Sequence, residues 1–116
     1  MITIAAIILF VFSVFCGMVL AMLHSMKVER PWTLTILHGV FAVSALVFLA
    51  VAVLSGAMPT MKLALILFVV TALGGMFLVS FRLRGKDLPT PALVVHAVLA
   101  AAAFVALVLN FGAIKL

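Results

Sequence analysis

Two histidines hold equivalent places in two long apolar segments of this chain. His38 and His96 each lie about six residues after the start of their segment, which corresponds to about 9 Å along a helix. An ionisable side chain within a membrane span is rare and energetically costly, so it indicates a functional site. Imidazole is a metal ligand, a proton carrier and a hydrogen-bonding group. The matched spacing predicts that the two imidazoles meet at one depth.

Two glycines fall in the same predicted layer. Gly17 and Gly75 each lie about six residues before the end of the apolar segment that precedes a histidine, with the small hydroxyls of Ser13 and Thr71 one turn away. Glycine allows another group to approach the helix backbone closely. A flat ligand held between two imidazoles needs such space at its edges. The layer therefore predicts a site for a planar, largely apolar ligand, with both histidines as metal ligands.

Basic side chains gather near the end of these segments. His24 and Arg82 follow the two glycines by two helical turns, and Lys27, Arg30 and Arg84 are close to them in sequence. Cationic side chains form charge-assisted hydrogen bonds with carboxylates and phosphates. We therefore expect His24 and Arg82 to meet acidic groups at the rim of the ligand.

This arrangement resembles the membrane b-type cytochromes, in which haem lies inside a four-helix bundle between histidines of two parallel helices. The resemblance is architectural and spans all four apolar segments. It implies haem b as the cofactor, His38 and His96 as its axial ligands, and Gly17 and Gly75 as the flanking glycines. Those families usually carry two haems, whereas this chain has histidines for one. The implied activity is one-electron transfer, with quinone, a partner subunit or a soluble reductant as the redox partner.

Other functions are compatible with the same residues. A protein that carries, stores or senses haem without redox turnover would use the same ligands. In a haem-free structural or assembly subunit, the histidines would form hydrogen bonds between helices. Two histidines without a nearby carboxylate or thiol make a poor zinc or copper site. Small four-helix multidrug transporters rely on a carboxylate inside their first helix, whereas the acids of this chain, Glu29 and Asp87, lie outside the apolar segments. No catalytic residue is assigned.

Four apolar segments must position these residues. The chain of 116 residues is 70% apolar and has a mean hydropathy of +1.62. A soluble domain of this size cannot bury that much apolar surface. Segments at about 3–23, 32–55, 61–81 and 90–110 have the length of a membrane span, and the second break falls at Met58–Pro59. The sequence predicts an all-α membrane protein, a four-helix up-down bundle forming a single domain of residues 1–116. The first segment lacks the features of a cleaved signal peptide and is expected to be retained.

The chain is also predicted to be two tandem copies of one helical hairpin, 1–58 and 59–116. Aligned without a gap, the copies are identical at fifteen of 58 positions, where the composition alone would give about six. The identities include a glycine, a proline and the histidine. Each copy holds two helices, so both copies enter the membrane from the same side. The two histidine-bearing helices then run parallel on one diagonal of the bundle.

Charge predicts the orientation. Of the seven basic residues behind the net charge of +5, five lie in the first and third connections, and Lys62 and Lys115 lie on the opposite side. By the positive-inside rule these two connections face the cytoplasm and both termini lie outside, in what we expect to be a bacterial inner membrane. No basic face is left for nucleic acid. The lone Cys16 is expected to be a buried, inert thiol. Lipid is the main partner, and a homodimer could form through the lipid-facing sides.

Overall fold

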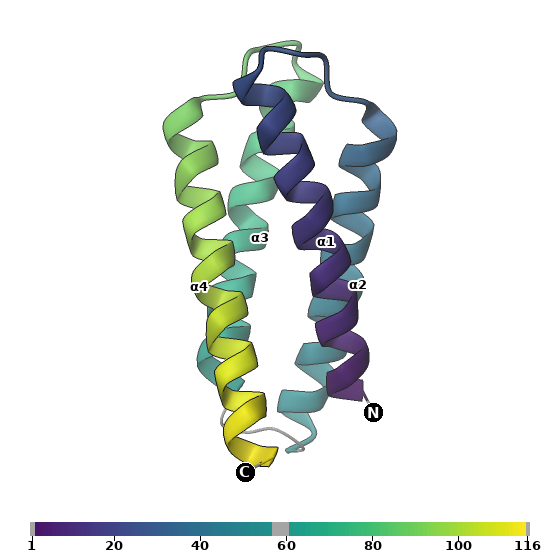
Figure 1. Ribbon diagram of the computed structural model, residues 1–116, viewed down its shortest axis with the longest axis vertical. Coiled ribbons are helices and arrows are strands. Elements are labelled where there is room, and N and C mark those ends of the chain that lie inside the picture. Colours follow the sequence, from purple (N-terminus) through teal and green to yellow (C-terminus); the bar gives the residue numbers. More distant parts are fainter. Residues whose placement is uncertain (1, 57–60, 116) are drawn as a thin grey trace.

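Four helices make up the computed structural model, which describes residues 2–56 and 61–115 (Figure 1). The helices are α1 (Ile2–Ser25), α2 (Trp32–Leu54), α3 (Lys62–Leu83) and α4 (Thr90–Lys115). The predicted all-α fold with four helices is confirmed. The break expected at Met58–Pro59 lies outside the described residues.

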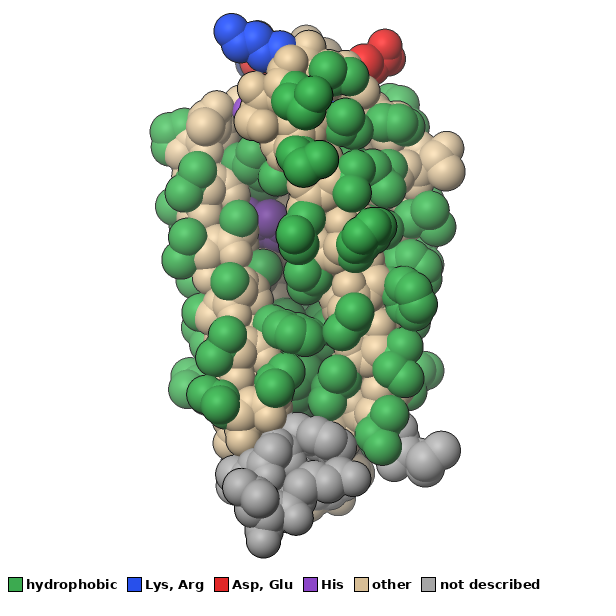
Figure 2. Space-filling view, viewed as in Figure 1, with side chains coloured by type: hydrophobic (Ala, Val, Ile, Leu, Met, Phe, Trp, Pro, Cys, Tyr) green, Lys and Arg blue, Asp and Glu red, His purple; other side chains and the backbone are tan. Residues whose placement is uncertain are grey.

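Each helix is long and apolar enough to cross a membrane. Their lengths of 24, 23, 22 and 26 residues exceed the approximately 20 residues that the hydrocarbon layer requires. Apolar side chains cover almost the whole described length of the face shown in Figure 2, and large exposed apolar side chains occur on all four helices. Such a surface is stable in lipid and not in water, so the chain is an integral membrane protein.

The helices are arranged as two hairpins. Helix α1 packs along α2 and α3 packs along α4, while smaller contacts between α2 and α3 and between α1 and α4 join the hairpins. Helices α1 and α3 therefore lie on one diagonal, and α2 and α4 lie on the other. The connections 26–31 and 84–89 lie together at what we call the loop end, and both termini lie at the opposite, terminal end (Figure 1).

The fourth helix extends beyond its predicted end. The sequence pattern predicts an end around Asn110–Gly112, yet the helix continues to Lys115. The side-chain amide of Asn110 donates a hydrogen bond of 2.7 Å to the carbonyl oxygen of Ala106, one turn earlier in the same helix. Because the Asn110 amide forms its hydrogen bond within α4, this residue does not end the helix.

A residue in the left-handed conformation follows the end of α1 and of α3, at corresponding positions of the two hairpins. Lys27 follows α1 with φ 57°, and Gly85 follows α3 with φ 68°. In both turns the amide of the next residue donates to a carbonyl in the last helical turn, as in a Schellman motif. Glycine adopts this conformation without steric penalty, whereas an L-residue such as lysine is strained by about 1–2 kcal/mol.

The packed core lies toward the terminal end. The rings of Phe10 and Phe68 stack across the α1–α3 diagonal with centroids 3.8 Å apart, and Leu49 and Leu107 are fully buried with them. From the level of the two histidines to the loop end, Cys16 and Leu78 are the only buried apolar residues in the described part of the chain. The loop-side section of the bundle therefore lacks a packed interior.

Candidate functional site

Helix α1 holds the imidazole of His38. Its Nδ1 atom lies 2.8 Å from the carbonyl oxygen of Ser13. A carbonyl oxygen can only accept, so Nδ1 carries the hydrogen and the lone pair of the neutral ring is on Nε2. The buried Ser13 hydroxyl donates to the carbonyl oxygen of His38 at 3.0 Å and lies 3.2 Å from Nδ1. The ring orientation and its tautomer are therefore set within the first hairpin.

His96 repeats this contact in the second hairpin. Its Nδ1 atom donates to the carbonyl oxygen of Thr71 at 3.0 Å, which again leaves the lone pair on Nε2. The Thr71 hydroxyl, however, donates to the carbonyl oxygen of Leu67 in its own helix at 2.7 Å. His96 thus has one anchoring contact with α3, whereas residue 13 makes several with His38.

The two imidazoles meet across the α2–α4 diagonal. Their ring centroids are 6.3 Å apart and their planes lie at 82° to each other. Neither Nε2 atom forms a hydrogen bond within residues 2–56 and 61–115, and no fully buried side-chain nitrogen there lacks a partner. Both Nε2 atoms therefore border open space. A histidine is visible from outside the bundle, in a hollow between two columns of apolar side chains (Figure 2).

The glycines predicted for this layer pack directly against the imidazoles. A Cβ atom placed on Gly17 would lie 2.9 Å from Cε1 of His38, and one on Gly75 would lie 3.2 Å from Cε1 of His96. Each glycine therefore makes room for the ring of its own hairpin. Space for the edges of a planar ligand beside these glycines stays a prediction.

The donor set suits a metal that brings most of its own ligands. No group of three or more His, Cys, Asp or Glu side chains gathers among the described residues, so these imidazoles supply two coordination positions only. Metal–imidazole bonds are about 2 Å long, so one ion shared by two coordinating rings holds their centres about 6 Å apart. The observed 6.3 Å agrees with this value. Two imidazoles on opposite sides of an ion could hold a metal that brings its other ligands with it.

His24 has protein partners on both ring nitrogens. Arg30 donates to its Nδ1 atom at 2.8 Å, so the ring hydrogen is on Nε2, which lies 3.3 Å from the hydroxyl of Thr90. These contacts connect the end of α1 with the start of α4. His24 thus adopts the tautomer opposite to that of the two histidines in the bundle, and it has no free lone pair to offer a metal.

Arg82 connects the other two helices of the loop end. Its guanidinium donates hydrogen bonds to the hydroxyl of Thr35 and the carbonyl oxygen of Arg30. The same group lies 3.9 Å from the ring centroid of Trp32, which is a cation–π distance. Arg82 therefore links the end of α3 to the start of α2. The contact of Arg82 and His24 with acidic groups of a ligand stays a prediction.

A cavity of about 1240 Å³ opens at the loop end. The apolar part of its wall comes from the ends of α1, α2 and α4, and includes Ala21 and Ala97. Its charged wall contains Lys27 and two arginines together with two acids. It lies in the section of the bundle that lacks a packed core. Its size is sufficient for a cofactor-sized ligand, since such pockets usually measure about 300–1,000 Å³.

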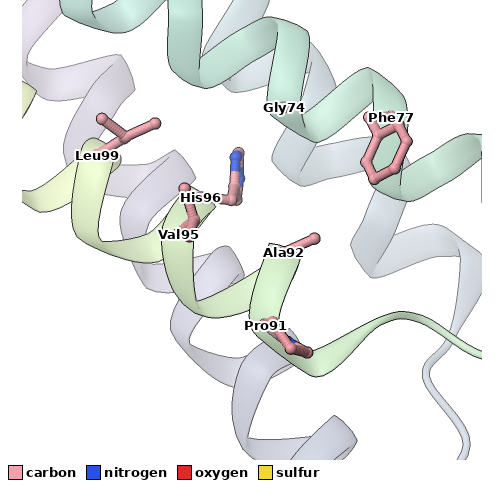
Figure 3. A pocket seen from close by; sticks show the side chains of 7 residues that line it. All are labelled: Gly74, Phe77, Pro91, Ala92, Val95, His96 and Leu99. Carbon is pink, nitrogen blue, oxygen red and sulfur yellow. The ribbon is translucent and has the colours of Figure 1, made fainter.

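A smaller groove of about 330 Å³ makes the two histidines unequal. It lies between α3 and α4 and is lined by Gly74, Phe77, Pro91, Ala92, Val95, His96 and Leu99 (Figure 3). At the corresponding positions of the first hairpin, Cys16 replaces Gly74 and Phe41 replaces Leu99. Cys16 is buried, as predicted. The first hairpin therefore has larger side chains at two positions that line the groove beside His96 in the second hairpin.

The carbonyl groups of Ser13 and Thr71 are the part of the site that sequence reasoning missed. The sequence points to the hydroxyls of these residues, one turn from the glycines, whereas main-chain acceptors have no side-chain signature. One signal was present: each lies 25 residues before its histidine, so the repeat carries the pair along together.

Comparison of the chain with protein-family models, with curated proteins and with solved structures finds no match.

Proposed function

We propose that this protein binds one haem b between His38 and His96 and transfers single electrons. The observation that carries the proposal is the pair of imidazoles with centroids 6.3 Å apart, each anchored through Nδ1 to a carbonyl oxygen. A histidine that binds a metal through one ring nitrogen usually donates a hydrogen bond from the N–H of the other, which fixes the ring and raises its basicity. The two Nε2 lone pairs are the axial ligands in this proposal.

The empty loop-side section supports the same proposal. A planar, apolar cofactor needs a volume that side chains leave unfilled, and Cys16 and Leu78 are the only buried apolar residues described in this section. The cavity of about 1240 Å³ lies there.

The protein's own residues would hold the cofactor and exclude water. Haem with both axial positions filled supplies one-electron chemistry and has no open position for oxygen. The carbonyl anchors keep each imidazole from rotating, and the two glycines let the rings lie close to α1 and α3. The apolar helices would exclude water on the sides that face lipid, while the cavity at the loop end is open.

We further propose that the loop end faces the cytoplasm of a bacterial cell. Lys27, Arg30, Arg82, Arg84 and Lys86 all belong to this end, and positive charge accumulates on the cytoplasmic side of membrane proteins. A reporter domain fused to the C-terminus tests this orientation. The reporter is expected to be active only if it functions outside the cytoplasm.

Difference spectra test haem binding. The protein purified in detergent and loaded with haem is expected to give the reduced-minus-oxidised spectrum of a two-histidine haem. His38→Ala and His96→Ala are each expected to abolish that spectrum. His24→Ala is the control for iron binding alone, because both of its ring nitrogens already have protein partners. This variant is expected to keep the shape of the spectrum, whatever its effect on haem affinity. Unchanged spectra in the first two variants would show that other groups bind the iron.

The openness of the loop-side cavity favours a second function, that of a haem carrier or sensor. An electron-transfer protein is expected to retain its haem when mixed with an apo-acceptor and to be reduced by quinol. A carrier is expected to release haem quickly and to show no quinol-dependent reduction. Failure of the purified protein to bind haem would favour a structural or assembly subunit.

A further inference from the structure

The charged side chains around the loop-side cavity differ in how many hydrogen bonds they form with other groups of the protein. Three cations line it, Lys27, Arg30 and Arg82, and so do the carboxylates of Glu29 and Asp87. The charge of this wall is therefore mixed. An acidic group of a ligand is bound most readily by a cation whose hydrogen-bond donors are all free.

Two of the three cations have partners within the protein. Both terminal nitrogens of Arg82 donate to groups of the first hairpin, and its guanidinium lies over the ring of Trp32. Arg30 gives one nitrogen to His24. The ammonium of Lys27 is exposed and forms no hydrogen bond or ion pair with the described residues.

The backbone of Lys27 adds a second observation. The residue has φ 57°, whereas the second hairpin has glycine at the corresponding position, Gly85, with φ 68°. The first hairpin thus has a strained lysine where glycine meets the same backbone requirement without strain. Strain of this kind is found at sites where the side chain has a function.

We infer that Lys27 is the residue that binds the acidic edge of the ligand in the loop-side cavity, through its ammonium group. This inference rests on the proposed haem function and identifies the ligand groups as the haem carboxylates. An anionic lipid headgroup has the same chemistry and is the alternative that the experiment must separate.

Lys27→Gly is an informative variant because the two effects of the substitution have opposite signs. Removal of the ammonium is expected to weaken haem binding about five- to tenfold, as for a charge-assisted contact near the surface. Relief of the left-handed strain is expected to raise the melting temperature of the haem-free protein by a few degrees. Lys27→Asn removes the same positive charge and introduces a residue that also tolerates the left-handed conformation.

The measurements are haem titrations followed by absorbance and thermal unfolding of the haem-free protein, both in neutral detergent. Lys86→Gln is the matched control, since it removes an ammonium from the other loop, outside the cavity wall. The haem dimethyl ester, which has no free carboxylates, is expected to bind the natural protein and Lys27→Gly equally. If the natural protein and Lys27→Gly bound unmodified haem with equal affinity, the inference would be overturned while the haem function stayed intact.

Two further outcomes are decisive. If the natural protein binds no haem, both the haem function and the role of Lys27 are rejected. If Lys27→Gly changes thermal stability only in nanodiscs that contain anionic lipid, with haem affinity unchanged, the ammonium binds a lipid headgroup and the inference is wrong.

Discussion

The Nδ1 atom of His38 and the carbonyl oxygen of Ser13 lie 2.8 Å apart, and both belong to the first hairpin. His96 and Thr71 make the equivalent contact within the second hairpin. Each hairpin therefore orients its own imidazole independently of the other. A site between the rings is assembled when the hairpins pack together, and a ligand bound to both rings would hold them together.

The hydroxyl groups beside the two histidines are predicted to differ in importance. Ser13→Ala removes the hydrogen bond to the carbonyl oxygen of His38 and is expected to lower the free energy of unfolding by about 1 kcal/mol. Thr71→Val removes a hydroxyl that bonds only within its own helix, and a change below about 0.5 kcal/mol is expected. Unfolding in mixed micelles measures both. Equal losses would show that the Ser13 hydroxyl does not join α1 to α2.

Added methyl groups are predicted to displace the imidazoles. In Gly17→Ala the new Cβ would lie 2.9 Å from the ring of His38, which cannot move away without stretching its bond to Ser13. We expect a loss of about 1–3 kcal/mol in unfolding free energy and weaker haem binding. Gly75→Ala, with a contact of 3.2 Å, is expected to lose less.

Gly39→Ala provides the control for these two glycine substitutions. A Cβ atom at this helical position meets none of the described atoms within 4 Å, so the gain in helix propensity is expected to stabilise the protein by up to about 1 kcal/mol. If all three alanine variants behaved alike, contact with the imidazoles would not be the cause.

The sequence predicted those features that follow from burial in lipid and from repetition. Four spans were recognisable because each must keep about 20 residues apolar. The meeting of His38 and His96 followed from the spacing of two copies of one hairpin. The left-handed conformation of Lys27 was not foreseen, because its repeat partner Gly85 gives no sign that lysine would adopt it.

The roles of Arg82 and Gly17 depend on neighbours that sequence spacing does not reveal. A cation at a helix end is compatible with water, lipid, a ligand or the protein itself, and the packing of the hairpins gives Arg82 the ring of Trp32. Gly17 was assigned to the approach of a ligand, whereas the rotamer of His38 brings its own ring against this position. Both contacts depend on side-chain conformations.

Arg82 is predicted to stabilise the contact between the hairpins at the loop end. Arg82→Gln removes the charged donor to Thr35 and the cation over Trp32, and a loss of about 1–2 kcal/mol is expected. Arg84→Gln is the control, since Arg84 donates to Ser80 in its own helix and connects no two helices. Its effect is expected to stay within about 0.5 kcal/mol. Equal effects in denaturant titrations would indicate that Arg82 contributes through charge alone.

The stacked rings of Phe10 and Phe68 are predicted to couple the hairpins at the terminal end. Their centroids are 3.8 Å apart and their planes differ by 7°, and they belong to helices on opposite corners of the bundle. A double-mutant cycle with Phe10→Leu and Phe68→Leu is expected to give a coupling energy of about 0.5–1.5 kcal/mol. The cycle for Phe77 and Phe81, 5.0 Å apart within α3, is the control and is expected to give about 0.2–0.5 kcal/mol, as for neighbours on one helix. A coupling no larger than this control would mean that burial alone holds the terminal end together, without a specific contribution from the stacked pair.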